Sequence, residues 1–219
     1  VEEAARLGLQ ALALTDRDGF YGVVRFAQAA RGTGIGTVFG VEVSLAEIGG
    51  SIVLLAQGPS GYARLSRAIS VAQLAGSKGA PKFSLRMLAD ECSGHVAILT
   101  GADEGAIPRS LRDRGPAEAE RALSLLVDSF GADSVWVELW DHGTPMCSAR
   151  NDALVRSAAL IGIPVLATND VHYATPSDHR LANVFAAVRA GSALTEHDSW
   201  LPAGSTAHLR SAREQLRRF

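Results

Sequence analysis

The sequence has little of what identifies a nucleic-acid-binding surface, a disulfide framework or a membrane segment. Its 219 residues carry 21 basic and 23 acidic side chains, so the net charge is −2, whereas nucleic-acid-binding domains often have a pI above about 9. The two cysteines, Cys92 and Cys147, are far apart and form no CxxC pair, which argues against a zinc knuckle or a disulfide framework. No apolar run approaches the roughly 20 residues that span a bilayer. We expect a soluble protein of the reducing cytoplasm, without a membrane contact.

What the sequence does contain is enough apolar material for one sizeable core. Hydrophobic residues make up 47% of the chain, and its length is that of a single domain. Residues 1–9 have the pattern of the last turns of an amphipathic helix that ends at Gly8. We therefore expect the chain to begin inside a structural element, with an upstream strand missing.

Short apolar segments alternate with segments of helical periodicity, which predicts an α/β fold. The expected strands cover residues 11–15, 37–45, 51–56, 95–100, 135–140 and 164–168, and the expected helices 21–31, 62–74, 85–90, 117–130, 149–160 and 178–190. Glycines that follow the helical segments, such as Gly162, predict their ends. The alternation favours parallel strands joined by helical crossovers, and a closed or nearly closed barrel over an open sheet.

Polar residues follow several of these strands at their carboxyl ends, where barrel active sites form. Asp16 and Arg17 follow the first strand, and Glu42 interrupts the second. Asp170 and His172 follow the last strand, two residues apart, so in an extended segment both side chains point to one side. A carboxylate and an imidazole placed in this way could bind one divalent cation.

Six motifs are distributed along the chain: ALALTDRDGFYG (11–22), VFGVEV (38–43), GYARLSRAIS (61–70), VELWDHG (137–143), PVLATNDVHYATP (164–176) and WLPAGSTAHLRSAREQLRRF (200–219). Together they resemble the PHP (polymerase and histidinol phosphatase) domain of bacterial polymerase III alpha-like subunits, which are C-family DNA polymerases. The variant forms are most similar to the error-prone, damage-tolerant branch.

The resemblance implies a distorted (β/α)7 PHP barrel over residues 1–199, without its first strand, and an exit segment over residues 200–219 towards the polymerase palm. It implies a parent DNA polymerase, a nucleotidyltransferase of DNA replication and repair, with Mg²⁺ at palm carboxylates outside this chain. The implied partners are the palm and thumb of that polymerase, DNA and the sliding clamp through the parent chain, and accessory bypass factors. The fragment alone is expected to be inactive.

The resemblance also implies up to nine ligands for two or three metal ions, either Zn²⁺ or Mn²⁺, of which this chain keeps a part. The HxH pair that opens the family pattern is absent. Residues matching the ligand pattern are Asp16, Glu42, Asp170 and His172, and residues departing from it are Arg17, Ser51 and Ala102. We expect a degenerate metal site in which the Arg17 guanidinium replaces the metal as a cation between Glu42 and Asp170.

Two other functions stay open. One is a metal-dependent phosphoesterase, either a 3′–5′ exonuclease or a small phosphatase, which requires a metal-bound hydroxide. The other is an interaction module with no polymerase attached.

Several single residues also allow two interpretations. Asp16 could cap a helix or form an Asx-turn, Glu138 could face the barrel mouth or pair with an arginine, and His142 fits a turn better than the site. The tryptophans fit core or interface positions better than base stacking. The C-terminal arginines suggest DNA binding, but Ser211 and Glu214 form a capping box, which favours a solvated helix.

Overall fold

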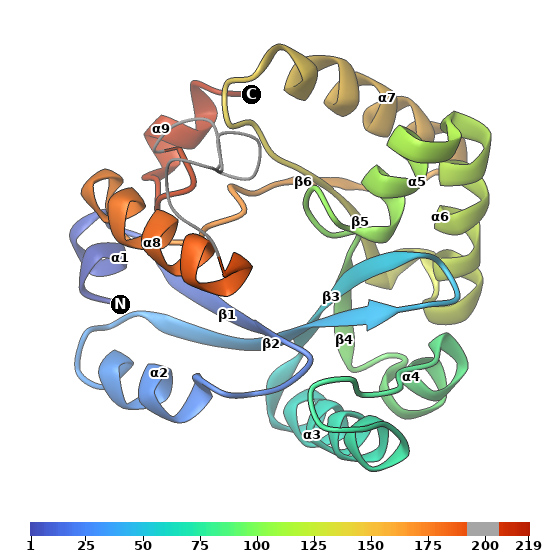
Figure 1. The fold of residues 1–219 in the computed structure, drawn as a ribbon, viewed down its shortest axis with the longest axis horizontal. Helices are drawn as coiled ribbons and strands as arrows, with labels where there is room; N and C mark the ends of the chain where they lie inside the picture. The colour runs from blue at the N-terminus through green and yellow to red at the C-terminus, as the bar shows by residue number, and fades with distance from the viewer. Residues whose placement is uncertain (192–205) are drawn as a thin grey trace.

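The computed structural model describes residues 1–191 and 206–219, and its centre is a curled six-stranded sheet with helices around the outside (Figure 1). The strands, in their order across the sheet, are β1 (Ala11–Arg17), β2 (Gly36–Leu45), β3 (Gly50–Ala56), β4 (Val96–Leu99), β5 (Val135–Leu139) and β6 (Val165–Ala167). The helices are α1 (Glu2–Arg6), α2 (Val23–Ala30), α3 (Gly58–Ala75), α4 (Leu85–Cys92), α5 (Ala106–Arg114), α6 (Pro116–Phe130), α7 (Pro145–Ile161), α8 (His179–Ala190) and α9 (Ala212–Leu216).

The expected all-parallel arrangement is wrong for β3. This strand pairs antiparallel with both β2 and β4, whereas the β1–β2, β4–β5 and β5–β6 pairs are parallel. The reason is the short connection: residues 46–49 are too few for a helical crossover, which needs a dozen or more, but suffice for a hairpin. The fold is therefore a mixed α/β fold.

The curled sheet forms a half-barrel, and the expected seven β/α units are not found among the described residues. Helix α5 lies in a region for which the sequence pattern predicted no element. Its Pro108 is in the first turn, where the missing N–H costs no helical hydrogen bond, so this proline starts a helix instead of breaking one. Among the described helices, none combines the length and apolar character needed to cross a membrane.

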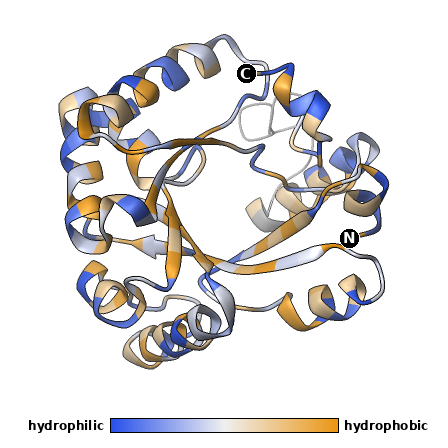
Figure 2. Ribbon diagram, turned by 180° about the vertical axis from the view of Figure 1, so that it is seen from behind, coloured by the Kyte–Doolittle hydropathy of each residue, from blue (hydrophilic) through white to orange (hydrophobic). Residues whose placement is uncertain are grey.

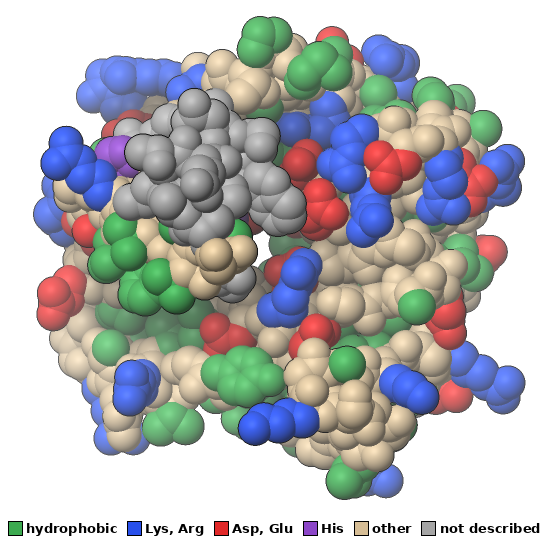
Figure 3. Space-filling view, in the orientation of Figure 1, with side chains coloured by type: hydrophobic (Ala, Val, Ile, Leu, Met, Phe, Trp, Pro, Cys, Tyr) green, Lys and Arg blue, Asp and Glu red, His purple; other side chains and the backbone are tan. Residues whose placement is uncertain are grey.

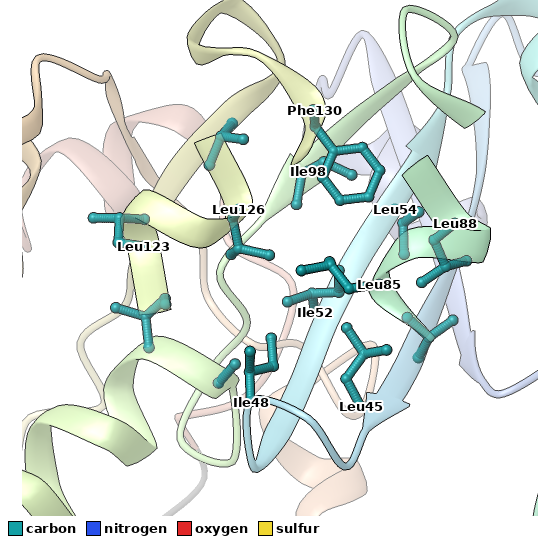
Figure 4. Close-up of a cluster of buried hydrophobic side chains, with 14 of the residues drawn as sticks. Leu45, Ile48, Ile52, Leu54, Leu85, Leu88, Ile98, Leu123, Leu126 and Phe130 are labelled. Atoms are coloured by element: carbon teal, nitrogen blue, oxygen red, sulfur yellow. The ribbon is translucent and has the colours of Figure 1, made fainter. Parts of the chain in front are cut away.

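The main core lies between the outer face of the sheet and the helices that cover it. Leu45, Ile52 and Leu54 on β2 and β3 are buried against Leu88 of α4 and Leu126 of α6 (Figure 4). Seen from behind, the strands carry much of the apolar colour, with polar residues on the outer sides of the helices (Figure 2). Both cysteines, Cys92 and Cys147, are buried, and both are free thiols.

Candidate functional site

The first part of the candidate site lies where β1 and β2 end side by side. Arg17 and Glu42 are directly opposite each other in the parallel register. Arg17 Nη2 donates a hydrogen bond to Glu42 Oε1 at 2.8 Å, and this bond raises the pKa of the arginine. The Arg17 and Glu42 side chains are 57% and 30% exposed, so the ion pair is worth at most about 1 kcal/mol.

Ser51 supplies a second donor to the same oxygen atom. Its hydroxyl donates to Glu42 Oε1 at 2.6 Å, and its side chain is buried. Because β3 runs antiparallel, the first residues of this strand lie beside the last residues of β2, with Ser51 opposite Ser44. One carboxylate oxygen of Glu42 therefore accepts from both a guanidinium and a hydroxyl.

Asp16 does not join Glu42, because consecutive residues of a strand point to opposite faces. Strand β1 continues through Arg17, two residues beyond its predicted end. The Asp16 carboxylate accepts a hydrogen bond from the Gly22 N–H at 2.6 Å, at the residue that precedes the first turn of α2. The structure thus gives Asp16 a role at the start of this helix, one of the two alternatives in the sequence.

Asp170 and His172 lie together after β6, but not in the extended segment on which their predicted arrangement depended. His172 Nε2 is 3.4 Å from Asp170 Oδ2. Asp170 has a φ of 42°, in the left-handed region that only asparagine, aspartate and glycine adopt with little cost. The Arg17 guanidinium pairs with Glu42, whereas Asp170 pairs with His172, so the expected bridge of Arg17 to both carboxylates is not present in the described part of the chain.

Glu138 on β5 is a buried carboxylate that the sequence left unassigned. Its side chain is 6% exposed, and Oε1 accepts a hydrogen bond from Thr168 Oγ1 at 2.6 Å, whereas Oε2 has no hydrogen-bond partner among the described residues. Burial, with a smaller contribution from the charges of Asp170 and Glu42, raises its pKa to about 7. The signal in the sequence was a glutamate among the apolar residues of a strand that is buried on both faces.

These residues do not fit the expected cluster of two or three metal ions. In residues 1–191 and 206–219, no group of three or more His, Cys, Asp or Glu side chains is arranged to hold a metal ion. Glu42 Oε1 already receives two donors, and the Asp16 carboxylate receives a backbone N–H. On the face of the molecule drawn in Figure 3, acidic and basic side chains are interspersed.

The loop that follows β5 joins the site to the C-terminal segment. His142 Nε2 lies 2.9 Å from the Asn169 carbonyl oxygen, so this histidine holds the backbone beside Asp170. Trp140 is buried, as predicted, with the Arg150 guanidinium 3.5 Å from its ring centroid. Asn169 Nδ2 donates to the carbonyl oxygens of Thr206 and His208 at 3.0 and 2.6 Å.

The predicted capping box of α9 is present, because Ser211 and Glu214 bond each other's backbone. The expectation that the C-terminal arginines are largely solvated is wrong for Arg210, which is 8% exposed and donates to the Asp141 carbonyl oxygen at 3.2 Å. This position lies before the helix, where the chain packs on the loop after β5. Residues 200–205, with Trp200, lie outside the described residues.

Comparisons with known proteins agree with the motifs. The PHP domain family matches residues 1–142. An error-prone DNA polymerase of Mycolicibacterium paratuberculosis is 47% identical over the whole chain, one of Mycobacterium tuberculosis H37Rv is 46% identical, and one of Cutibacterium acnes is 42% identical. The chain spans about a fifth of the length of these relatives (21%, 21% and 20%).

A solved structure shows the same fold. It is that of a proposed metal-dependent phosphoesterase from Bifidobacterium adolescentis, with a TM-score of 0.52, 14% sequence identity, and coverage of 78% of this chain and 79% of the other. At this identity the likeness concerns the fold alone. The family match over residues 1–142 and the identity along the whole chain lead to one conclusion: the chain belongs to the PHP domain family, and it is homologous to the corresponding part of error-prone DNA polymerases.

Proposed function

We propose that this chain is the PHP module of an error-prone DNA polymerase that acts in DNA replication and repair, in damage-tolerant synthesis, in the cytoplasm. The supporting observation is the identity of 40–47% that covers the whole chain in several such polymerases. Template-directed nucleotidyl transfer would take place at palm carboxylates outside these residues, with Mg²⁺ supplied there. The sliding clamp, DNA and accessory bypass factors would act through the parent chain.

In this proposal the module is not catalytic, and the Arg17 guanidinium replaces the metal at Glu42. The observation that carries it is the Arg17–Glu42 hydrogen bond of 2.8 Å, at an oxygen atom that also accepts from Ser51. A guanidinium compensates the carboxylate charge but cannot activate a water molecule for hydrolysis. Asp16, Glu42, Asp170 and His172 would then be remnants of an ancestral metal site.

The module would act by packing against the palm and thumb of its own polymerase. Helix α8 exposes four large apolar side chains at helical spacing, Leu181, Val184, Phe185 and Val188. Residues spaced three, four and seven apart lie on one face of a helix. Because the relatives are about five times as long as this chain, we assign this face to the remaining part of the polymerase.

The second candidate is a metal-dependent phosphoesterase, which the likeness of fold to the Bifidobacterium protein favours. The two candidates differ in metal content. In the full-length protein, we expect metal analysis by mass spectrometry to find far less than one Zn²⁺ or Mn²⁺ ion per protein molecule outside the polymerase site. The triple variant R17H/S51H/A102C, which restores three ligand types of the family pattern, should bind more metal than its parent.

A matched control is Arg86→His, which places a histidine on α4 at an arginine that also pairs with a carboxylate, Asp90. This variant should leave metal binding unchanged. Stoichiometric Zn²⁺ or Mn²⁺ in the parent protein would contradict the replacement by Arg17. A triple variant that binds no more metal than Arg86→His would show that the ligand positions are wrongly assigned.

A further inference from the structure

A surface pocket in the C-terminal segment collects positive charge. Its lining residues are Thr206, His208, Arg210, Glu214, Arg217 and Arg218. Three of the six are arginines, and one is acidic. The Arg218 guanidinium lies over the loop after β5, since a Cβ atom added at Gly143 would be 3.1 Å from its Nη1 atom. The pocket is therefore formed where α9 meets this loop.

The positive charge of this pocket is partly offset by the nearby charges of Asp141 and Glu214, but its arginines form no ion pair in the described part of the chain. Arg210, Arg217 and Arg218 form no ion pair within residues 1–191 and 206–219. Arg210 bonds neutral oxygen atoms: the carbonyls of Asp141 and Thr206 at 3.1–3.2 Å, and Gln215 Oε1 at 3.5 Å. Hydrogen bonds to neutral oxygens satisfy the donors but leave the charge uncompensated.

The one carboxylate in the lining, that of Glu214, already accepts hydrogen bonds from Ser211. Glu214 Oε2 accepts from the Ser211 N–H at 2.8 Å and from the Ser211 hydroxyl at 2.7 Å, and these two bonds lower the pKa of Glu214. With three arginines and one glutamate, the lining carries a formal charge of about +2. Burial and the nearby charge of Arg218 lower the pKa of Arg210, as expected for a cation next to another cation.

An uncharged donor lies in the same pocket. The Thr206 hydroxyl oxygen is buried and has no hydrogen-bond partner among the described residues. Buried hydroxyl groups are nearly always bonded, so an orphaned one at the wall of a pocket leaves a donor available to a bound acceptor. The pocket thus combines guanidinium groups with an unsatisfied hydroxyl.

We propose that this pocket binds a phosphate group. Guanidinium groups bind phosphate oxygens through paired, charge-assisted hydrogen bonds, and the hydroxyl of Thr206 can donate to a further oxygen. Inorganic phosphate or a phosphate monoester carries up to about two negative charges near neutral pH, which balances the charge of the lining, and two successive phosphates of a DNA backbone carry the same charge, whereas a carboxylate supplies one. The ligand class is inorganic phosphate, a phosphate monoester or the phosphodiester backbone of DNA.

Hydrogen exchange in the full-length protein tests this proposal at the pocket itself. Sodium phosphate, compared with sodium chloride at equal ionic strength, should slow amide exchange in peptides that cover residues 206–219. The Arg217→Ala variant should weaken the phosphate affinity obtained from this protection by roughly tenfold, because a hydrogen bond to a charged group is worth about 1.5–3 kcal/mol.

Arg213→Ala is the matched control, because it removes the same charge from α9 at an exposed residue that does not line the pocket. It should leave the phosphate affinity unchanged. Equal exchange in phosphate and chloride would overturn the proposal, and so would an equal loss of affinity in Arg213→Ala and Arg217→Ala.

The two sources of the phosphate group are separated by a second titration. A single-stranded oligonucleotide that protects residues 206–219, with weaker protection in Arg217→Ala, assigns the pocket to the DNA backbone. Protection by inorganic phosphate but not by the oligonucleotide assigns it to a small phosphate compound. Both results support a phosphate site, and this test is independent of the metal analysis proposed for Arg17.

Discussion

Glu42 and Glu138 show how differently one fold treats two neighbouring carboxylates. Glu42 is partly exposed and shares one oxygen with Arg17 and Ser51, so its charge is compensated. Glu138 is buried, one of its oxygens has a hydroxyl partner, the other has no partner in the described part of the chain, and its pKa is about 7. A buried carboxylate without a cation favours its neutral form.

We expect Glu138 to make the stability of the protein depend on pH. Its pKa in the folded protein, about 7, lies above its ordinary value of 4.5, so the folded state keeps a proton that the unfolded chain releases in this window. The free energy of unfolding should therefore fall as the pH rises from about 4.5 to about 7, by on the order of 3 kcal/mol.

The Glu138→Gln variant should remove this dependence, because glutamine has no proton to release. Urea denaturation across the window should give a flatter profile and a more stable protein at about pH 8 than the parent. Glu2→Gln, at an exposed residue of α1, is the control and should keep the parent profile. A Glu138→Gln profile that follows the parent would show that Glu138 is ionised in the folded protein.

At the level of elements, helix α3 depends on one glycine for its contact with the sheet. Gly61 is buried in the first turns of the helix, and a Cβ atom added there would lie 2.2 Å from the His95 carbonyl oxygen. The same carbonyl accepts a hydrogen bond from the Gln57 N–H at 2.9 Å, immediately before the helix. The His95 carbonyl oxygen is a backbone atom and not the end of a flexible side chain, so the clash can be relieved only by moving backbone.

Gly61→Ala should destabilise the protein by up to about 2 kcal/mol. The alanine gains roughly 1 kcal/mol of helix propensity, but overpacking against a backbone atom costs about 1–3 kcal/mol, and a separation of 2.2 Å is at the severe end. Thermal unfolding measures the change. Ser70→Ala, at an exposed residue of the same helix, should be nearly neutral; a Gly61→Ala protein as stable as this control would mean that α3 can move away from β4.

At the scale of the whole molecule, residues 206–219 are hydrogen-bonded to the segment that follows β6, on both sides of Asp170. His172 N–H donates to the Ala207 carbonyl oxygen at 2.9 Å, and the Gln215 side chain donates to the Thr168 carbonyl. In Figure 1, α8 and α9 are both drawn at the same side of the half-barrel, and α8 exposes the apolar face formed by Leu181, Val184, Phe185 and Val188.

If the rest of the polymerase packs on this face, Phe185→Asp should impair the full-length protein. A charge in a buried contact costs several kcal/mol, so we expect a lower melting temperature and less DNA synthesis. The control is Leu74→Asp, at an exposed leucine near the end of α3. If the two variants have the same melting temperature and the same level of DNA synthesis, α8 is not part of the interface.

The sequence by itself determined the family, the α/β class and most element positions. Its motifs extend along the whole chain, and helix ends such as Gly162 follow from local backbone preference, with a φ of 81° at this glycine. The proximity of Asp170 and His172 follows from their separation of two residues, whereas the left-handed φ of 42° at Asp170 differs from the extended segment expected there.

The tertiary structure alone decided the direction of β3, the separation of Asp16 from Glu42, the burial of Glu138 and the pocket around Arg210. Each depends on how strands and segments far apart in the sequence are placed beside one another. Periodicity reports which residues are apolar, but the register between strands decides which carboxylate meets a cation and which is buried without one. For that reason the identity of the family could be derived from the sequence, whereas the chemistry of its site could not.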